Sequence, residues 1–129
     1  MDQDINFESI EYDWEYLPRD VDNVVLFLHT KTVDSIEYEY EGADYWQSPE
    51  ESYYLGAGDC EDMCIYFAYL YYMLTGDDSV QLVLWKTTNL FMLHMTVYFP
   101  GWDRYVFLSG NETEIENKYG FWDIFRRKE

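Results

Sequence analysis

The segment that decides the fold is residues 48–76, SPEESYYLGAGDCEDMCIYFAYLYYMLTG. It predicts two consecutive helices separated by a glycine turn. Ser48 can cap the first helix, because Pro49 suits the first helical position and Glu51 can complete a capping box. The sequence GAG at residues 56–58 ends that helix. A short helix therefore leads directly into a second one.

The second helix is expected to begin after Asp59 and to end at Gly76. Asp62, three residues after Asp59, gives a variant of the capping box. Apolar residues then recur at helical spacing, at Cys60, Met63, Cys64, Phe67, Tyr71 and Leu74. The opposite face carries Ile65 and several tyrosines and is apolar too. We therefore expect this helix at the centre of the domain, covered on most sides.

The flanking segments predict an α+β domain that spans residues 1–129. Residues 1–15 are acidic and are interpreted as a loose arm. A helix is expected after Pro18, with His29 at its C-terminal end, and the alternation at residues 36–41 indicates an edge strand or extended loop. We expect strands at residues 80–85, 90–99 and 104–109, a hairpin turn at 100–103 and a short helix at 112–119.

The composition favours a folded and strongly acidic protein. Of 129 residues, 48% are hydrophobic and 21% aromatic, which is enough for a core. The chain has 26 acidic and 8 basic residues, a formal charge of −18. This charge disfavours nucleic acids and anionic membranes as partners, because both are negative. It suits a basic peptide or protein, although solubility alone also explains it, and the oligomeric state stays open.

No stretch approaches the ~18 apolar residues of a membrane span, and the N-terminus lacks the basic region of a signal peptide. Cys60 and Cys64 lie one helical turn apart, where a disulfide has poor geometry, so we expect free thiols. Free thiols suit a reducing compartment or a secreted enzyme that needs its thiol, and we favour the cytoplasm. No cofactor is expected. A metal site of Cys60, Cys64 and His94 is disfavoured, because no second Cys/His pair accompanies it.

Cys60 is the candidate nucleophile. It occupies the first helical position, where unpaired amides and the helix dipole favour a thiolate, and its own amide could point at a developing oxyanion. Asp59, Glu61 and Asp62 act in the opposite direction, since nearby negative charge raises the pKa of a thiol. Cys60 therefore needs a cationic neighbour. Cys64 is interpreted as a small buried hydrophobic residue.

His94 is the candidate base, because a histidine in contact with a cysteine can form a thiolate–imidazolium pair. If residues 100–103 form the hairpin turn, Phe99 pairs with Arg104. The same register places His94 opposite Ser109, with Asn111 as its diagonal neighbour. Ser109 or Asn111 is therefore the side chain expected to orient the imidazole.

These residues resemble the core of the transglutaminase-like superfamily, including its bacterial cysteine peptidases. The similar elements are Trp46 with the SPEE lead-in, the GDCED motif at residues 58–62 and the helix that ends at Gly76. The His94 strand and its hairpin follow in the expected order, so the resemblance covers roughly residues 20–111.

The resemblance implies a papain-like cysteine-protease fold and acyl transfer through a thioester on Cys60, with His94 as base. It also implies that Asp62 is a structural residue of the helix start and that Trp46 or Gln47 lines the site and helps the oxyanion. Family members usually carry an Asp in the strand after the His. Residues 108–111 of this chain read LSGN, so either the triad is incomplete or Asn111 replaces the Asp.

Three functions are therefore compared. The first is a cysteine hydrolase or acyltransferase acting on peptide or isopeptide amides, with water or an amine as acceptor. The second is a binding module that keeps the fold and has lost catalysis. The third is an acidic interaction domain whose match to the family is accidental, which an all-helical or sandwich fold would establish.

Overall fold

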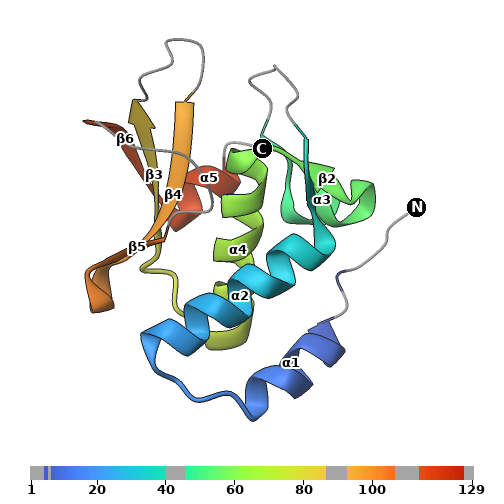
Figure 1. Cartoon of the computed structure of the whole chain (residues 1–129). Helices are drawn as coiled ribbons and strands as arrows, with labels where there is room; N and C mark the ends of the chain where they lie inside the picture. The colour runs from blue at the N-terminus through green and yellow to red at the C-terminus, as the bar shows by residue number, and fades with distance from the viewer. Residues whose placement is uncertain (1–4, 6, 40–45, 87–92, 107–113, 127–129) are drawn as a thin grey trace.

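A computed structural model of the chain describes residue 5 and residues 7–39, 46–86, 93–106 and 114–126. Helix α4 lies between a four-stranded sheet and helices α2 and α3 (Figure 1). The elements are α1 (Phe7–Glu15), α2 (Val21–Ser35), β1 (Glu37–Tyr38), α3 (Pro49–Leu55), β2 (Ala57–Gly58), α4 (Cys60–Thr75), β3 (Gln81–Lys86), β4 (Leu93–Phe99), a 3-10 turn (Pro100–Trp102), β5 (Arg104–Val106), β6 (Glu114–Gly120) and α5 (Phe121–Arg126). Helices followed by an antiparallel sheet confirm the α+β prediction.

The central helix is the one that the sequence predicts. Asp59 is the N-cap of α4, Asp62 completes the capping box, and Gly76 ends the helix in the left-handed conformation at φ 75°. Most α4 side chains are buried, and Phe67 and Tyr71 place their rings 6.1 and 4.9 Å from that of Phe99 on β4. Each large apolar side chain buried in this way contributes roughly 1.5–3 kcal/mol, so α4 organises the core.

The sheet has the strand order β5-β4-β3-β6. Phe99 pairs with Arg104 and Tyr98 with Tyr105, which confirms the predicted hairpin register. Met95, Val97 and Phe99 belong to the core that includes α4. Tyr98 lies on the opposite face, where its ring is 4.4 Å from that of Tyr105. The two faces of β4 thus have different environments.

The predicted helix at residues 112–119 is wrong. Residues 114–120 form β6, which pairs antiparallel with β3 and gives that strand a second neighbour. Ile115 and Tyr119 are four residues apart, a spacing that also suits a helix, so the local sequence carries no clear strand signal. Pairing with β3 outweighs the local helix propensity, because an unpaired strand edge leaves backbone hydrogen-bonding groups without partners.

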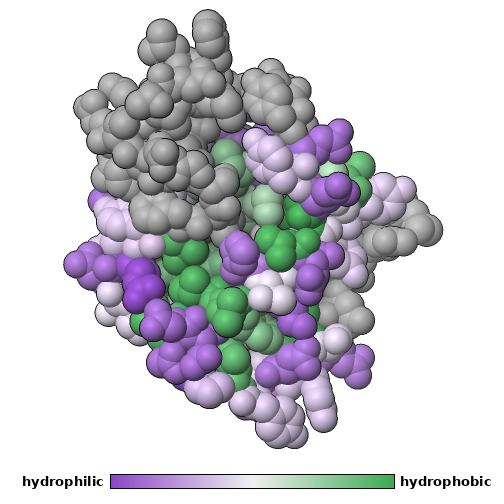
Figure 2. All heavy atoms as spheres, viewed as in Figure 1, coloured by the Kyte–Doolittle hydropathy of each residue, from purple (hydrophilic) through white to green (hydrophobic). Residues whose placement is uncertain are grey.

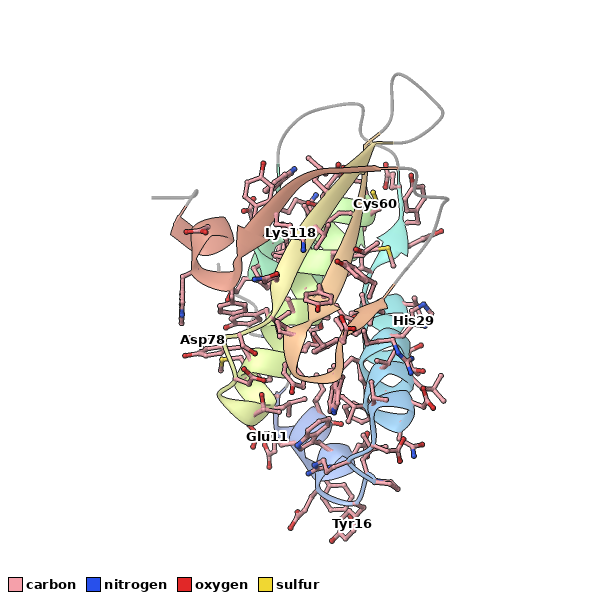
Figure 3. The ribbon with its side chains drawn as sticks, turned by 90° about the vertical axis from the view of Figure 1, so that its left-hand side faces the viewer. Glu11, Tyr16, His29, Cys60, Asp78 and Lys118 are labelled. Atoms are coloured by element: carbon pink, nitrogen blue, oxygen red, sulfur yellow. The ribbon has the colours of Figure 1, made fainter. Side chains whose placement is uncertain are left out.

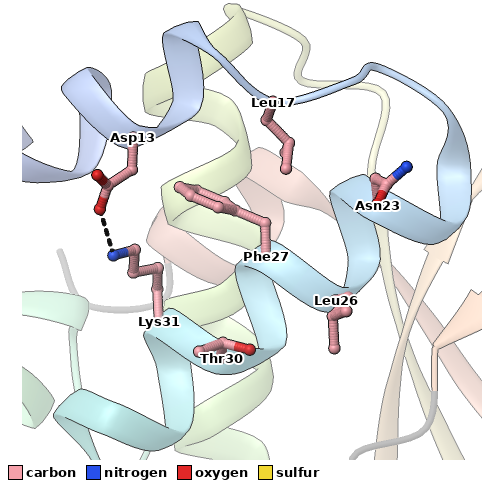
Figure 4. A pocket seen from close by; sticks show the side chains of 7 residues that line it. All are labelled: Asp13, Leu17, Asn23, Leu26, Phe27, Thr30 and Lys31. Carbon is pink, nitrogen blue, oxygen red and sulfur yellow. Dashed lines mark hydrogen bonds and ion pairs between the residues drawn. The ribbon is translucent and has the colours of Figure 1, made fainter.

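The interpretation of residues 1–15 as a loose arm is wrong for residues 7–15, which form α1. Ile10 and Trp14 are each 8% exposed, and the ring of Trp14 lies 5.6 Å from that of Phe27 on α2. Lys31 on α2 forms a 2.7 Å ion pair with Asp13 (Figure 4). The spacing of Phe7, Ile10 and Trp14 is a helical signal that the high acidic content obscured.

Helix α2 begins after Asp20 as expected but continues to Ser35. His29 therefore lies in the interior of this helix, and its placement at the C-terminal end is wrong.

A shallow groove of about 300 Å³ runs between α1 and α2, beside Leu26, which is 63% exposed (Figure 4). On the face of the molecule seen in Figure 1, hydrophobic residues gather near the middle and hydrophilic residues lie around them (Figure 2).

Within the described ranges, no helix combines the length and the apolar character needed to cross a bilayer.

Replacing Trp14 with Ala tests whether α1 is a packed part of the fold. We expect the free energy of unfolding to fall by about 3 kcal/mol, because a large buried ring is lost from the contact with Phe27. Tyr12→Ala on the same helix is the control, since Tyr12 is 65% exposed and its removal should change this energy by less than about 0.5 kcal/mol. Equal, small effects in urea unfolding would show that α1 is not packed.

Candidate active site

Cys60 is the first residue of α4 and is 7% exposed. Figure 3 shows it at the end of that helix, beside the sheet. Cys64, one turn later, is fully buried, and its Sγ donates a hydrogen bond to the carbonyl oxygen of Met95 at 3.2 Å. Neither cysteine is in a disulfide. Both thiols therefore lie along β4, and Cys64 has the buried structural position expected for it.

The buried carboxylate of Asp62 fixes the backbone around Cys60. One of its oxygens accepts a hydrogen bond from the amide of Asp59 at 3.1 Å, and the other accepts from the amide of Gln47 at 2.8 Å. The amide of Asp62 in turn donates to Asp59 Oδ1 at 3.1 Å. Asp62 thus has the structural position that the family resemblance implies.

The lead-in to α3 is brought to the same place. Gln47 is 3% exposed, and its Oε1 accepts a hydrogen bond from Ser52 Oγ at 2.7 Å. Trp46 is 9% exposed, with its ring 5.4 Å from that of Tyr119 on β6. The hydrogen bond from the Gln47 amide to Asp62 joins this lead-in to the start of α4, and the predicted role of Trp46 or Gln47 in lining the site stays a prediction.

The glycine turn before Cys60 is held by a parallel pair of strands. The amides of Glu37 and Glu39 donate to the carbonyl oxygens of Gly56 and Gly58, each at 2.8 Å. A Cβ atom on Gly58 would lie only 2.8 Å from the Cβ of Asp62. Glycine at this position is therefore required by the close approach of Asp62.

The surroundings of Cys60 keep its thiol protonated. Burial raises the pKa of Cys60 to about 12, and repulsion from Glu61 and Asp59 adds to this, whereas the Met95 backbone lowers it. None of these main influences is a cation. The pKa of Cys60 therefore lies far above neutral pH, and the protonated thiol is favoured. The described residues alone therefore do not activate Cys60.

Two carboxyl groups beside the thiol also have raised pKa values. Burial raises the pKa of Glu61 to about 8, with further contributions from a hydrogen bond to Asp59 and repulsion by it. Burial is likewise the main reason that the pKa of Asp62 rises to about 7.

In the described part of the chain, no group of three or more His, Cys, Asp or Glu side chains is arranged to hold a metal ion.

The structure leaves three candidate residues undecided. The backbone of His94 belongs to β4 and pairs with Trp85, but its side chain lies outside the described residues. Ser109 and Asn111 also lie outside them. The arrangement of the imidazole and of its orienting group therefore stays a prediction.

Two contributors to the site were missed in the sequence. Met95 contacts the thiol of Cys64 through its carbonyl oxygen and influences that of Cys60 through its backbone. Ser52 supports Gln47. The role of Met95 has no local sequence signal, because a main-chain contact does not depend on side-chain type. The Ser52–Gln47 pair has none because it depends on how the lead-in folds back on α3.

No protein-family model matches this sequence, and no curated protein does. The structure is similar to three solved structures of Legionella pneumophila LapG, one calcium-bound, one EGTA-treated and one without a stated treatment. Each has a TM-score of 0.63 and 22% sequence identity, and covers 83% of this chain. The match covers 62% of the calcium-bound LapG chain and 60% of the other two.

This chain therefore spans about 60% of the length of the LapG structures. The likeness shows that it shares the fold of those structures, with helices packed on an antiparallel sheet. The fold class predicted from the sequence is confirmed.

Gly58→Ala tests the close approach at the helix start. We expect a loss of about 1–3 kcal/mol in the free energy of unfolding, because the added methyl group meets Asp62 and forces the turn to shift. Gly101→Ala is the control, since a Cβ there has no neighbour within 4 Å and should change this energy by less than about 0.5 kcal/mol. Denaturant unfolding measures both, and equal losses would contradict the requirement for glycine.

Glu61→Gln tests the protonated carboxyl group beside the thiol. Because the pKa of Glu61 is raised from 4.5 to about 8, the folded state keeps a proton that the unfolded state loses. This contribution to stability is complete below pH 4.5 and is lost as the pH rises through about 8. We expect the thermal midpoint of the parent to fall between pH 5 and pH 9, and that of the variant to fall less.

The control is Glu39→Gln, which removes one carboxyl group from an exposed residue. It should leave the steeper pH dependence of the parent in place, apart from a small general change in net charge. If Glu61→Gln and Glu39→Gln gave the same pH dependence, the buried proton would not be located at Glu61.

Proposed function

We propose that this chain is a transglutaminase-like cysteine hydrolase or acyltransferase that acts on peptide or isopeptide amides, with Cys60 as nucleophile and His94 as base. The supporting observation is the position of Cys60 at the start of a central helix, beside Met95 on β4. His94 is the residue before Met95, so its backbone belongs to the strand that packs against the thiol. The fold shared with LapG is in line with peptidase activity.

The chemistry begins with transfer of the Cys60 proton to the His94 imidazole. The sulfur forms a bond to the amide carbonyl carbon, and the C–N bond breaks as the imidazolium returns the proton to the leaving amine. The product is a thioester on Cys60. Water then releases a carboxylic acid in a peptidase, or an amine forms a new amide in a cross-linking enzyme, and the thiol is regenerated in both cases.

The developing oxyanion would be stabilised at the start of α4. Gln47 and Trp46 are held there, and an amide NH2 and an indole N–H are both hydrogen-bond donors. We propose that one of them donates to the oxyanion together with the backbone amide of Cys60. Ser109 or Asn111 would accept the second N–H of the imidazole, since both side chains have an acceptor oxygen.

The pleat of β4 sets a condition on this proposal. Met95, Val97 and Phe99 are in the core with α4, whereas Tyr98 lies on the other face. Residue 94 has the parity of Tyr98, and β4 pairs with β3 without a bulge from Tyr98 to Leu93. A contact of the residue 94 side chain with Cys60 therefore requires a strong twist at the start of the strand. The alternative is a binding module that keeps this fold without catalysis. The regular pairing of β4 with β3 through residue 94 and the raised pKa of Cys60 are the two observations that favour this alternative.

Calcium is named for one of the LapG structures. In this chain Asp59 and Asp62 of the GDCED motif are not arranged to bind one cation together, because both carboxylate oxygens of Asp62 accept hydrogen bonds from backbone amides. Asp59 Oδ1 likewise accepts the amide of Asp62. No step of the proposed reaction therefore involves a metal ion.

A thiol nucleophile suits a reducing compartment, and we propose that the protein acts in the cytoplasm.

Iodoacetamide alkylation of Cys60 tests the proposal. In Cys64→Ser protein, a thiolate–imidazolium pair predicts alkylation at pH 7 that is at least tenfold faster than in the same protein with His94→Ala. The reason is that the imidazolium would stabilise a thiolate which the surroundings otherwise suppress. The rate should reach a plateau below pH 8 with His94 and keep rising with pH without it.

Cys60→Ser protein is the control for the other thiol. Cys64 is fully buried, so its alkylation should be negligible in the folded chain. Equal Cys60 rates with and without His94, both rising steadily into alkaline solution, would contradict the catalytic pair and support the binding module.

A further inference from the structure

A second concave surface lies far from the thiol, between α1 and the C-terminal end of α4. It is a groove of about 580 Å³, within the size range of ligand pockets. Its lining residues are Glu8, Glu11, Tyr12, Trp14, Glu15, Arg19, Met73 and Leu74. Figure 3 places Cys60 near one end of the molecule and Glu11 near the other. From residue 60 to residue 73, α4 rises about 20 Å, at about 1.5 Å per residue.

The rim of this groove is negatively charged. Glu8, Glu11 and Glu15 lie at i, i+3 and i+7, which places them on one face of α1. Among the described residues, none of these three carboxylates has an ion pair. A cationic ligand would therefore meet three carboxylates that the described part of the chain leaves uncompensated.

Arg19 also lines the groove but is engaged elsewhere. Its guanidinium lies 4.0 Å from the centre of the Trp14 ring and donates to the carbonyl oxygens of Trp14 and Leu17. These contacts direct Arg19 toward the end of α1. They also show that a guanidinium already packs on an aromatic ring in this groove. A basic side chain of a ligand could make the same kind of contact with the exposed ring of Tyr12.

The apolar part of the groove is accessible. Tyr12 is 65% exposed and Met73 is 44% exposed, and Leu74 is packed against the core beside them. An aromatic ring and a flexible thioether suit the aliphatic part of a side chain such as Leu, Lys or Arg. The groove therefore combines an apolar floor with an acidic rim.

We propose that this groove is a docking site for a basic segment of a partner polypeptide that also carries a bulky aliphatic side chain. Its basic side chains pair with the three glutamates, and its aliphatic side chain packs on Tyr12 and Met73. The charge of −18 steers such a segment toward the protein. The site lies about 20 Å from Cys60 along α4, so binding there requires neither the thiol nor the proposed catalytic activity.

Fluorescence anisotropy with the full chain tests the docking site. The probe is a fluorescein-labelled 12-residue peptide of four Arg-Leu-Lys repeats. Comparison peptides replace every Leu with Ser, or every Arg and Lys with Glu. We expect saturable binding of the first peptide that weakens with salt, at least fivefold weaker binding of the serine peptide and no binding of the glutamate peptide.

Two triple variants with the same net charge separate local recognition from general attraction. Glu8→Gln/Glu11→Gln/Glu15→Gln removes the rim, and we expect at least tenfold weaker binding. Asp34→Asn/Glu37→Gln/Glu39→Gln removes three exposed acids from α2, β1 and the residue after it, and should weaken binding less than twofold. Met73→Ser should reduce the preference for the leucine peptide over the serine peptide.

Equal weakening in both triple variants would overturn the proposal, since the peptide would then respond to net charge alone. Equal binding of the leucine and serine peptides would also overturn it, because any polycation would serve. Because Cys60→Ser protein should bind the peptide as the parent does, failure of the thiol chemistry and failure of the docking site can be distinguished.

Discussion

The hydrogen bonds of one buried carboxylate hold the start of the central helix in place. Asp62 accepts hydrogen bonds from the backbone amides of Asp59 and Gln47. These bonds join the glycine turn, the lead-in to α3 and the first turn of α4. The same side chain packs so closely on residue 58 that only glycine fits there. The position of Cys60, the placement of Gln47 and the path of β2 all depend on this arrangement.

This arrangement has an electrostatic consequence. It buries the Cys60 thiol beside Glu61 and Asp59, and both the burial and these two acidic side chains favour the protonated thiol. The helix N-terminus works in the other direction, but its effect of about 0.3–1 kcal/mol is small beside the pKa shift of Cys60. A thiolate at Cys60 therefore needs a cation delivered by another segment, and β4 is the strand that the fold places next to it.

The two ends of α4 thus have different surroundings. At its start, polar groups are buried and satisfied by neighbouring backbone. At its end, α1 packs across it and leaves a groove with exposed acids and exposed apolar side chains. A rigid helix about 24 Å long separates the two regions, so a ligand bound at one end would influence the other only through the core.

The sequence by itself determined the helix boundaries at the site and the hairpin register. Ser48, Asp59, Asp62 and Gly76 act through hydrogen bonds and backbone conformations within a few residues of themselves, so their effects are readable locally. It also determined the α+β class, through the order of its helical and strand segments. The tertiary structure decided what depends on distant neighbours. Residues 114–120 form a strand because they pair with β3. Residues 7–15 form a helix whose Ile10 and Trp14 are buried in the folded domain. The burial that raises the pKa of Cys60 is likewise a property of the folded core, because desolvation depends on every segment packed around the sulfur.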